Sequence, residues 1–234
     1  MIPLRDANPT RRTPWVTLGL IALNVAAFLL WEPITGSPRE QQLFFICEGA
    51  IPRELSGFEA LRETQELCGG KSFLVSLFTS MFLHGGFLHI AGNMLYLWVF
   101  GNNIEDRMGP VPFLLFYLAA GIVAAYAQVF PDPDSLTPLV GASGAIAGAL
   151  GAYLVLFPSA RVLTLVPIFF FLQLIELPAM LVLGFWFVLQ AFQGVGSLGA
   201  DTGVAWFAHI GGFVFGALVA LFYRRRVTPQ PWSV

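Results

Sequence analysis

Two residues of the chain have the types and settings that nucleophilic catalysis needs. Ser143 lies in Gly141-Ala142-Ser143-Gly144, after a turn-rich segment and at the start of an apolar stretch. A serine in the first turn of a helix lies beside unpaired backbone N–H groups, which can hold an oxyanion on an attacked carbonyl. His209 is the base that such a serine needs, and Gly141 and Gly144 are assigned a supporting role. Without His209, a simple N-cap serine would be the better interpretation.

Two rows of small residues could bring this pair together. Small residues at about every fourth position let membrane helices touch closely. One row contains Ala208, Gly212 and Gly216, and the other contains Gly144, Gly148 and Gly151. Packing alone would explain the glycines, but it would not explain a serine paired with a histidine.

Two further polar side chains could stabilise an oxyanion. His89 and Asn93 are one helical turn apart, so they share a helix face. Both can donate hydrogen bonds while neutral, and with the backbone N–H of Ser143 they would complete an oxyanion hole. All three histidines of the chain, including His84, fall in or at the edge of apolar stretches. One buried histidine is usually a packing residue, whereas three of three indicate a site.

No acidic residue is placed to orient His209. Glu105, Asp106 and Glu176 fall at the inner ends of their segments, and nothing in the spacing favours Asp201. A Ser-His dyad is therefore predicted in place of a triad. No cysteine spacing indicates a metal site, and neither a metal nor a cofactor is expected.

The composition indicates a membrane protein. Apolar residues make up 56% of the 234 residues and charged residues 11%, against about a quarter charged in soluble domains. A net charge of −2 gives no indication of a nucleic-acid partner. We expect a single helical domain over residues 1–234, with the lipid bilayer as its solvent and the first apolar stretch retained as a span.

The predicted fold is an all-α bundle of six transmembrane helices. A bilayer core needs about 20 mostly apolar residues per helix. The predicted spans are residues 15–31, 86–104, 111–130, 141–157, 177–196 and 204–223. Segment 162–175 is apolar but only about fourteen residues long, so an interfacial or partly buried loop is expected there.

Basic residues predict the orientation. Arginines precede the first span and follow the last one, at positions 5, 11, 12, 224, 225 and 226. Because basic residues mark the cytoplasmic side, both termini are predicted to be cytoplasmic and the long loop 32–72 to face outward. The four polar residues of the site then lie within roughly 10 Å of the outer helix ends. The site would face the extracytoplasmic side, in the plasma (inner) membrane if the protein is bacterial.

The two cysteines, Cys47 and Cys68, lie in this outward loop. The outward side is usually oxidising, and closing a loop of this length could stabilise the fold by about 3 kcal/mol. A structural disulfide is favoured, and two small buried thiols are the alternative.

These motifs resemble the signatures of the rhomboid family of intramembrane serine proteases. They are His84-x-x-x-x-His89-x-x-x-Asn93 in the second predicted helix, Gly141-x-Ser143-Gly144 in the fourth and Ala208-His209-x-Gly211 in the sixth. The resemblance implies that Ser143 is the nucleophile, His209 the general base, and His89 and Asn93 the oxyanion donors. His84 would support the site from beneath the first loop.

The resemblance also implies a substrate and its route. The family cleaves single-span membrane proteins near or within their transmembrane segments. The substrate would approach along the fifth helix, which carries Phe185, Trp186 and Phe187. Gln128 is the candidate for a glutamine that helps water reach the site. Many relatives carry an aromatic residue four positions after the serine, but Ala147 stands there, so another side chain must hold the His209 ring.

Two other classes of function fit a helical membrane scaffold. A transporter or channel would use a polar pocket at the outer face, but its inverted repeats are not found in this sequence. A non-proteolytic chaperone or adaptor would leave Ser143 and His209 unexplained. The sequence therefore predicts an intramembrane serine endopeptidase.

Overall fold

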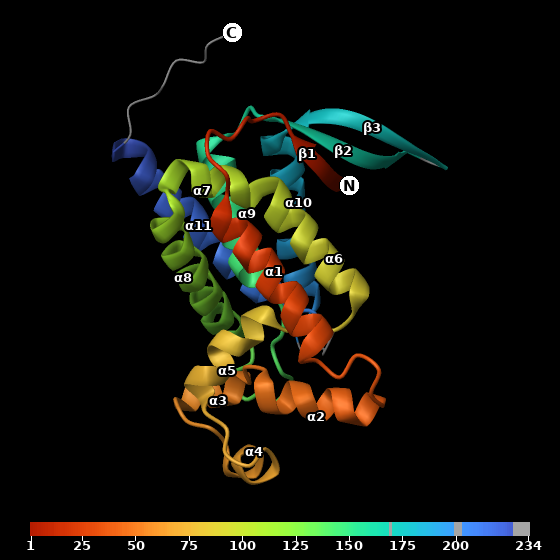
Figure 1. Ribbon diagram of the computed structural model, residues 1–234, viewed down its shortest axis with the longest axis vertical. Helices are drawn as coiled ribbons and strands as arrows, with labels where there is room; N and C mark the ends of the chain where they lie inside the picture. Colours follow the sequence, from red (N-terminus) through yellow and green to blue (C-terminus); the bar gives the residue numbers. More distant parts are fainter. Residues whose placement is uncertain (169, 199–202, 227–234) are drawn as a thin grey trace.

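The computed structural model describes residues 1–168, 170–198 and 203–226. They form a helical bundle with a helical cap at one end and a small β-sheet at the other (Figure 1). The bundle contains α1 (Trp15–Leu30), α6 (Phe87–Tyr96), the π-helical η2 (Leu97–Gly101), α7 (Asn102–Met108), α8 (Pro110–Val129), α9 (Ser143–Leu156), α10 (Ala179–Gly196) and α11 (Trp206–Arg226). The cap contains α2 (Pro38–Glu48), α3 (Pro52–Gly57) and α4 (Arg62–Leu67), and α5 (Phe73–Thr79) with the 3₁₀ turn η1 (Ser80–Phe82) leads back to the bundle.

Apolar helices occupy all six predicted spans. Among the described residues, α8, α10 and α11 are long and apolar enough to cross a bilayer. The helical segments 73–82 and 87–108 count as a fourth candidate, bent by 82° at the break between them. Helices α1 and α9 contain 16 and 14 residues, fewer than the roughly 20 that a bilayer core needs. Six crossings therefore stay a prediction.

A tight turn reverses the chain between the second and third predicted spans. Gly109 ends α7 with a φ of 87°, a conformation that glycine adopts without strain. Pro110 then opens α8, where its missing N–H costs no helical hydrogen bond. The two helices therefore run in opposite directions.

The segment 162–175 is not a loop, and the all-α prediction was wrong at this end of the molecule. Strands β2 (Arg161–Ile168) and β3 (Phe171–Pro178) form an antiparallel hairpin. Strand β1 (Ile2–Asp6) pairs with the base of β2, giving the order β1-β2-β3. Val162 and Thr164 are fully buried on alternate positions of β2, which is the period of a strand. The length and apolarity of a segment, the two features that define a span, do not reveal this alternation.

Close contacts at glycines hold α9 against α8 and α11. A methyl group on Gly144 or Gly148 would lie 2.6 or 2.5 Å from alanine side chains of α8. A methyl group on Gly212 or Gly216 of α11 would overlap the carbonyl oxygen of Gly144 or Gly148. The predicted close contact between the two glycine-bearing helices is therefore present.

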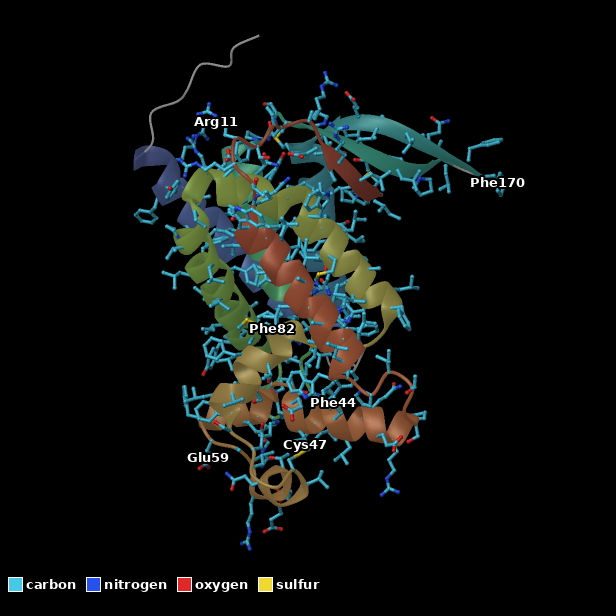
Figure 2. All side chains as sticks on the ribbon, in the orientation of Figure 1. Arg11, Phe44, Cys47, Glu59, Phe82 and Phe170 are labelled. Carbon is cyan, nitrogen blue, oxygen red and sulfur yellow. A yellow bond between two sulfur atoms is a disulfide. The ribbon has the colours of Figure 1, made fainter. Side chains whose placement is uncertain are left out.

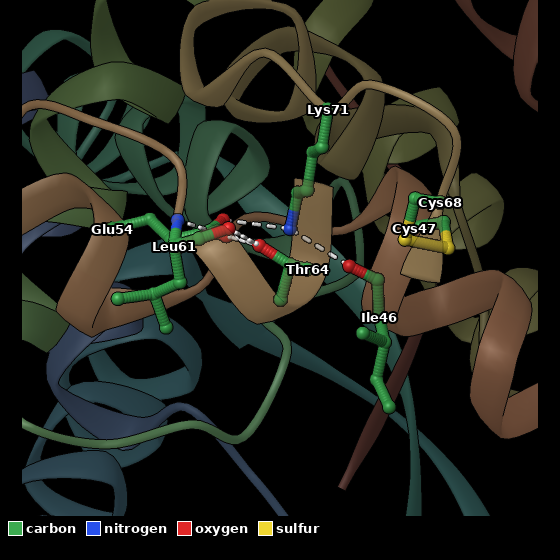
Figure 3. Close-up of a disulfide and its surroundings, with 7 residues drawn as sticks. All are labelled: Ile46, Cys47, Glu54, Leu61, Thr64, Cys68 and Lys71. Carbon is green, nitrogen blue, oxygen red and sulfur yellow. Dashed lines mark hydrogen bonds and ion pairs between the residues drawn. A yellow bond between two sulfur atoms is a disulfide. The ribbon is translucent and has the colours of Figure 1, made fainter. Parts of the chain in front are cut away.

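The predicted outward loop contains the cap, and the predicted disulfide between Cys47 and Cys68 is present (Figure 3). Cys47 lies near the end of α2 and Cys68 directly follows α4, so the bond fastens these two helices together.

A buried ion pair lies beside the disulfide (Figure 3). Lys71 Nζ is 2.7 Å from Glu54 Oε2 and donates to the carbonyl oxygen of Ile46 at 2.7 Å. Burial lowers the pKa of Lys71, and the Glu54 carboxylate acts in the opposite sense. Glu54 also accepts a hydrogen bond from Thr64 and one from the N–H of Leu61. The carboxylate thus joins α3 to α4 and to the chain that enters α5.

Strand β1 and the last turn of α11 lie at the same end of the bundle (Figure 1). This arrangement fits an even number of crossings. The side on which that end lies stays a prediction.

Candidate active site

Ser143 and His209 are hydrogen-bonded to each other. Ser143 is the first residue of α9, and His209 lies in the first turn of α11. His209 Nε2 lies 2.8 Å from Ser143 Oγ, although the residues are 66 positions apart. Both are half-buried. The backbone contact of α9 with α11 brings them together. The contact between Ser143 and His209 that the sequence predicted is therefore present.

Gln190, on α10, was not found from the sequence. Its side chain is 6% exposed, and its Oε1 lies 2.7 Å from Nδ1 of His209. An amide oxygen only accepts hydrogen bonds, so Nδ1 carries the proton and Nε2 is free to accept the proton of Ser143. Gln190 could have been found from the sequence because it is a polar residue inside the apolar predicted span 177–196.

Two tryptophans also contact the His209 ring. The ring of Trp186, from α10, has its centroid 6.0 Å from that of His209, and Trp206 of α11 meets it edge-on at 6.1 Å. Ala147, at the position of the missing aromatic residue, is fully buried next to Gly212. Gln190 and the two tryptophans therefore hold the ring in place of that aromatic residue.

Gly141 lies between Ser143 and His89. Its φ is 127°, in the region that favours glycine. A Cβ atom on Gly141 would lie 2.9 Å from His89 Nε2 and 3.5 Å from Ser143 Oγ. The N–H of Gly85 donates to His89 Nδ1 at 3.2 Å, so Nε2 carries the hydrogen and is available as a donor beside the serine.

Asn93 lies one turn beyond His89 on α6 and is 7% exposed. Among the described residues, its Nδ2 has no hydrogen-bond partner. Buried polar groups are nearly always paired, and an unpaired donor is costly. An amide group that stays unpaired until a substrate oxygen arrives is consistent with the predicted oxyanion role.

His84 packs edge-on against His89, with ring centroids 5.1 Å apart. The backbone N–H of His84 donates to Glu32 Oε1 at 2.9 Å. Burial raises the pKa of Glu32 to about 7, although this hydrogen bond acts in the opposite sense. The predicted supporting residue therefore contacts the predicted oxyanion donor, and it is fastened to the end of α1.

Gln128 holds the start of α11. Its Oε1 accepts the N–H groups of Phe207 and Ala208 at 3.0 and 3.1 Å, so it satisfies two first-turn donors that lack helical partners. This contact fixes the residue next to His209. A role in guiding water stays a prediction.

Glu105 and Glu176, two of the carboxylates named from the sequence, lie away from His209. Glu105 accepts the N–H groups of Val16 and Thr17, which fixes the start of α1 at the sheet end of the bundle. Glu176 is exposed on β3, and Asp201 lies outside the described residues. Within the described part of the chain, the hydrogen-bond partners of the His209 ring are Ser143 and Gln190.

The sequence profile of the Rhomboid domain matches residues 71–226, which include every residue of this site. The chain belongs to the rhomboid family. Its membership and its apolar helices make it an integral membrane protein.

Curated proteins of several organisms are similar to this rhomboid. Rhomboid protease GluP of Bacillus subtilis is 36% identical over 148 residues, which are 63% of this chain and 26% of GluP. Rhomboid protein 1, mitochondrial, of Saccharomyces cerevisiae is 29% identical over 163 residues, 67% of this chain and 44% of the yeast protein. The human presenilin-associated rhomboid-like protein, mitochondrial, is 28% identical over 203 residues, 85% of this chain and 45% of the human protein. The matches thus cover about a quarter to a half of these relatives' length.

Proposed function

We propose that this rhomboid is an intramembrane serine endopeptidase, with Ser143 as nucleophile and His209 as general base. The observation that carries the proposal is the 2.8 Å contact between His209 Nε2 and Ser143 Oγ. A serine hydroxyl is a weak nucleophile until a base removes its proton. One relative, GluP, is named a rhomboid protease.

The reaction follows from the positions of these groups. Ser143 Oγ attacks the carbonyl carbon of the peptide bond while His209 Nε2 takes the hydroxyl proton. The C–N bond then breaks, and His209 returns that proton to the leaving amine. Water attacks the acyl-serine and gives a proton to His209. The bond between the acyl carbon and Ser143 Oγ then breaks, His209 returns the proton to Oγ, and the carboxylic acid product leaves.

The negative oxygen of the tetrahedral intermediate needs hydrogen-bond donors. His89 Nε2–H, Asn93 Nδ2 and the backbone N–H of Ser143 supply them in this proposal. Donors fixed before the reaction stabilise the transition state most when water is excluded. The unpaired amide of Asn93 supports this assignment.

We infer that the substrates are membrane proteins, and more narrowly single-span proteins cut in or near their transmembrane segment. Phe185 of α10 is 54% exposed and faces the surroundings of the bundle. Trp186 and Phe187 instead pack inward, on His209 and Phe213. Of the three aromatic residues predicted to line the route of the substrate, we therefore propose Phe185 as the one that meets it. Cytoplasmic termini and an extracytoplasmic site belong to the same proposal. The yeast and human relatives are named as mitochondrial proteins.

A cleavage assay tests the proposal. Purified protein in lipid vesicles is mixed with a single-span substrate, and the products are separated by mass. We expect cleavage by the wild type and none by Ser143→Ala or His209→Ala, with unchanged melting temperatures. Ser72→Ala is the matched control, because Ser72 is exposed and its side chain makes no capping hydrogen bond. Substantial cleavage by either active-site variant would exclude the dyad.

A further inference from the structure

The β2–β3 hairpin projects sideways beyond the helices (Figures 1 and 2). The two strands pair from their base, at Arg161 and Pro178, to their tip, at Ile168 and Phe171. Strand β1 pairs only with residues 162–165 at the base. Beyond Leu165 the hairpin is an isolated pair of strands, which is marginally stable at best in water. The tip therefore needs a partner.

The tip is mostly apolar on both faces, and Gln173 is the one polar residue among its described positions. No charged residue lies between Arg161 and Glu176. Neighbouring residues of a strand point to opposite faces, yet Phe171 and Leu172 are 72% and 70% exposed, and Phe170 at the tip is 98% exposed. Sheets that face water usually carry polar residues on the wet face and charges on their edges. This hairpin has no charged residue at its tip, and Gln173 is the one polar side chain among the described tip positions.

The base of the hairpin is attached to a membrane helix. β3 passes through Pro178 directly into α10, one of the candidate spans. The exposed side chains of α10 include Leu181, Phe185 and Val188, so the apolar surface of the hairpin continues onto a surface that lipid covers. Basic residues attract anionic lipid headgroups, and the exposed Arg5 and Arg161 lie at the hairpin base.

We propose that the hairpin tip, formed by Val166–Ile168 and Phe170–Leu174, binds the lipid bilayer at the interface of the leaflet at the sheet end of the bundle. The aromatic and leucine side chains enter the upper acyl chains. The free edge of β3 stays at the level of the headgroups and water, because unpaired N–H and C=O groups do not enter the hydrocarbon core. This lipid contact is independent of the chemistry at Ser143.

A fluorescent label at the tip tests this contact. Both native cysteines form the disulfide, so Phe170→Cys introduces the one reactive thiol of the chain. The thiol is labelled with an environment-sensitive fluorophore in protein reconstituted into vesicles of phosphatidylcholine and phosphatidylglycerol. Quenching is measured with lipids that carry a nitroxide near the headgroup or deep in the acyl chain, and with aqueous iodide. The matched control is Asp134→Cys, an exposed position in the α8–α9 loop beside the cap.

We expect the Phe170→Cys label to emit at shorter wavelength than the control and to lose most of its emission to the shallow nitroxide lipid. Iodide should quench the control label and leave the tip label largely unaffected. Quenching of the tip label by iodide alone would place the hairpin in water and overturn the proposal. Quenching by neither agent would mean that protein covers the tip, and this result would overturn it equally. Neither readout requires proteolysis, so loss of the proposed function leaves this test intact.

Discussion

Gln190 Oε1 and His209 Nδ1 lie 2.7 Å apart and join α10 to α11. In a Ser-His-Asp triad this position is filled by a carboxylate, which fixes the tautomer of the histidine. A neutral amide fixes the same tautomer without placing a negative charge in a membrane-embedded site, where charge is expensive. In the proposed active site, Gln190 would therefore act as a third, uncharged member beside the predicted dyad.

Replacing Gln190 with alanine should lower kcat by roughly tenfold, because the loss of one such hydrogen bond is worth about 1.5 kcal/mol. KM and the melting temperature should change little. Gln190→Glu keeps an acceptor oxygen and should recover part of the lost rate. A positioning role is excluded if Gln190→Ala cleaves as fast as the wild type.

Asn93→Ala and His89→Ala should each lower turnover by about 10²-fold, the usual cost of one oxyanion donor. Labelling of Ser143 by a fluorophosphonate should persist in both, since the nucleophile and base are retained. The measurement is kcat for the two single variants and the double variant. Wild-type rates in all three would mean that these side chains only pack.

Gly212→Ala should separate α11 from α9 beside the active site. The added methyl group would overlap the carbonyl oxygen of Gly144, next to Ser143, and overpacking of this kind costs about 1–3 kcal/mol. We expect Gly212→Ala to have a lower melting temperature than the wild type and to lose more cleavage activity than the control variant. The control is Gly184→Ala in α10, where a methyl group meets no atom within 4 Å. Equal behaviour of the two variants would contradict the backbone contact.

Lys71→Ala should destabilise the cap by about 3–5 kcal/mol, because it leaves the Glu54 carboxylate buried without its partner. The exposed pair of Arg62 and Glu66 offers the comparison, with side chains 89% and 67% exposed, and Arg62→Ala should cost under about 1 kcal/mol. Denaturant-dependent proteolysis of the cap measures both. Similar costs would show that the buried pair adds no special stability.

The sequence predicted the parts of the molecule that depend on local pattern. Hydropathy located the six apolar helices, and the glycine rows of α9 and α11 predicted the contact that joins Ser143 to His209. The start of α2 could also have been predicted from the sequence, because Ser37 and Glu40 form a capping box at its N-terminus.

Other parts depend on pairings between distant segments. Strand β1 of the sheet is formed by residues 2–6. No local sequence pattern links these residues to residues 161–168 of β2. Gln190 stands in an apolar helix, and its role depends on the rotation of α10 about its axis. A hydropathy profile does not predict how a helix is rotated about its axis.

Labelling with a fluorophosphonate tests the central claim most directly. The wild-type protein in lipid vesicles is treated with the probe, digested and analysed by mass spectrometry, beside Ser143→Ala and His209→Ala. We predict one adduct, on Ser143, which is absent from Ser143→Ala and strongly reduced in His209→Ala. A folded wild-type protein that stays unlabelled, or an adduct on another serine, would contradict the account.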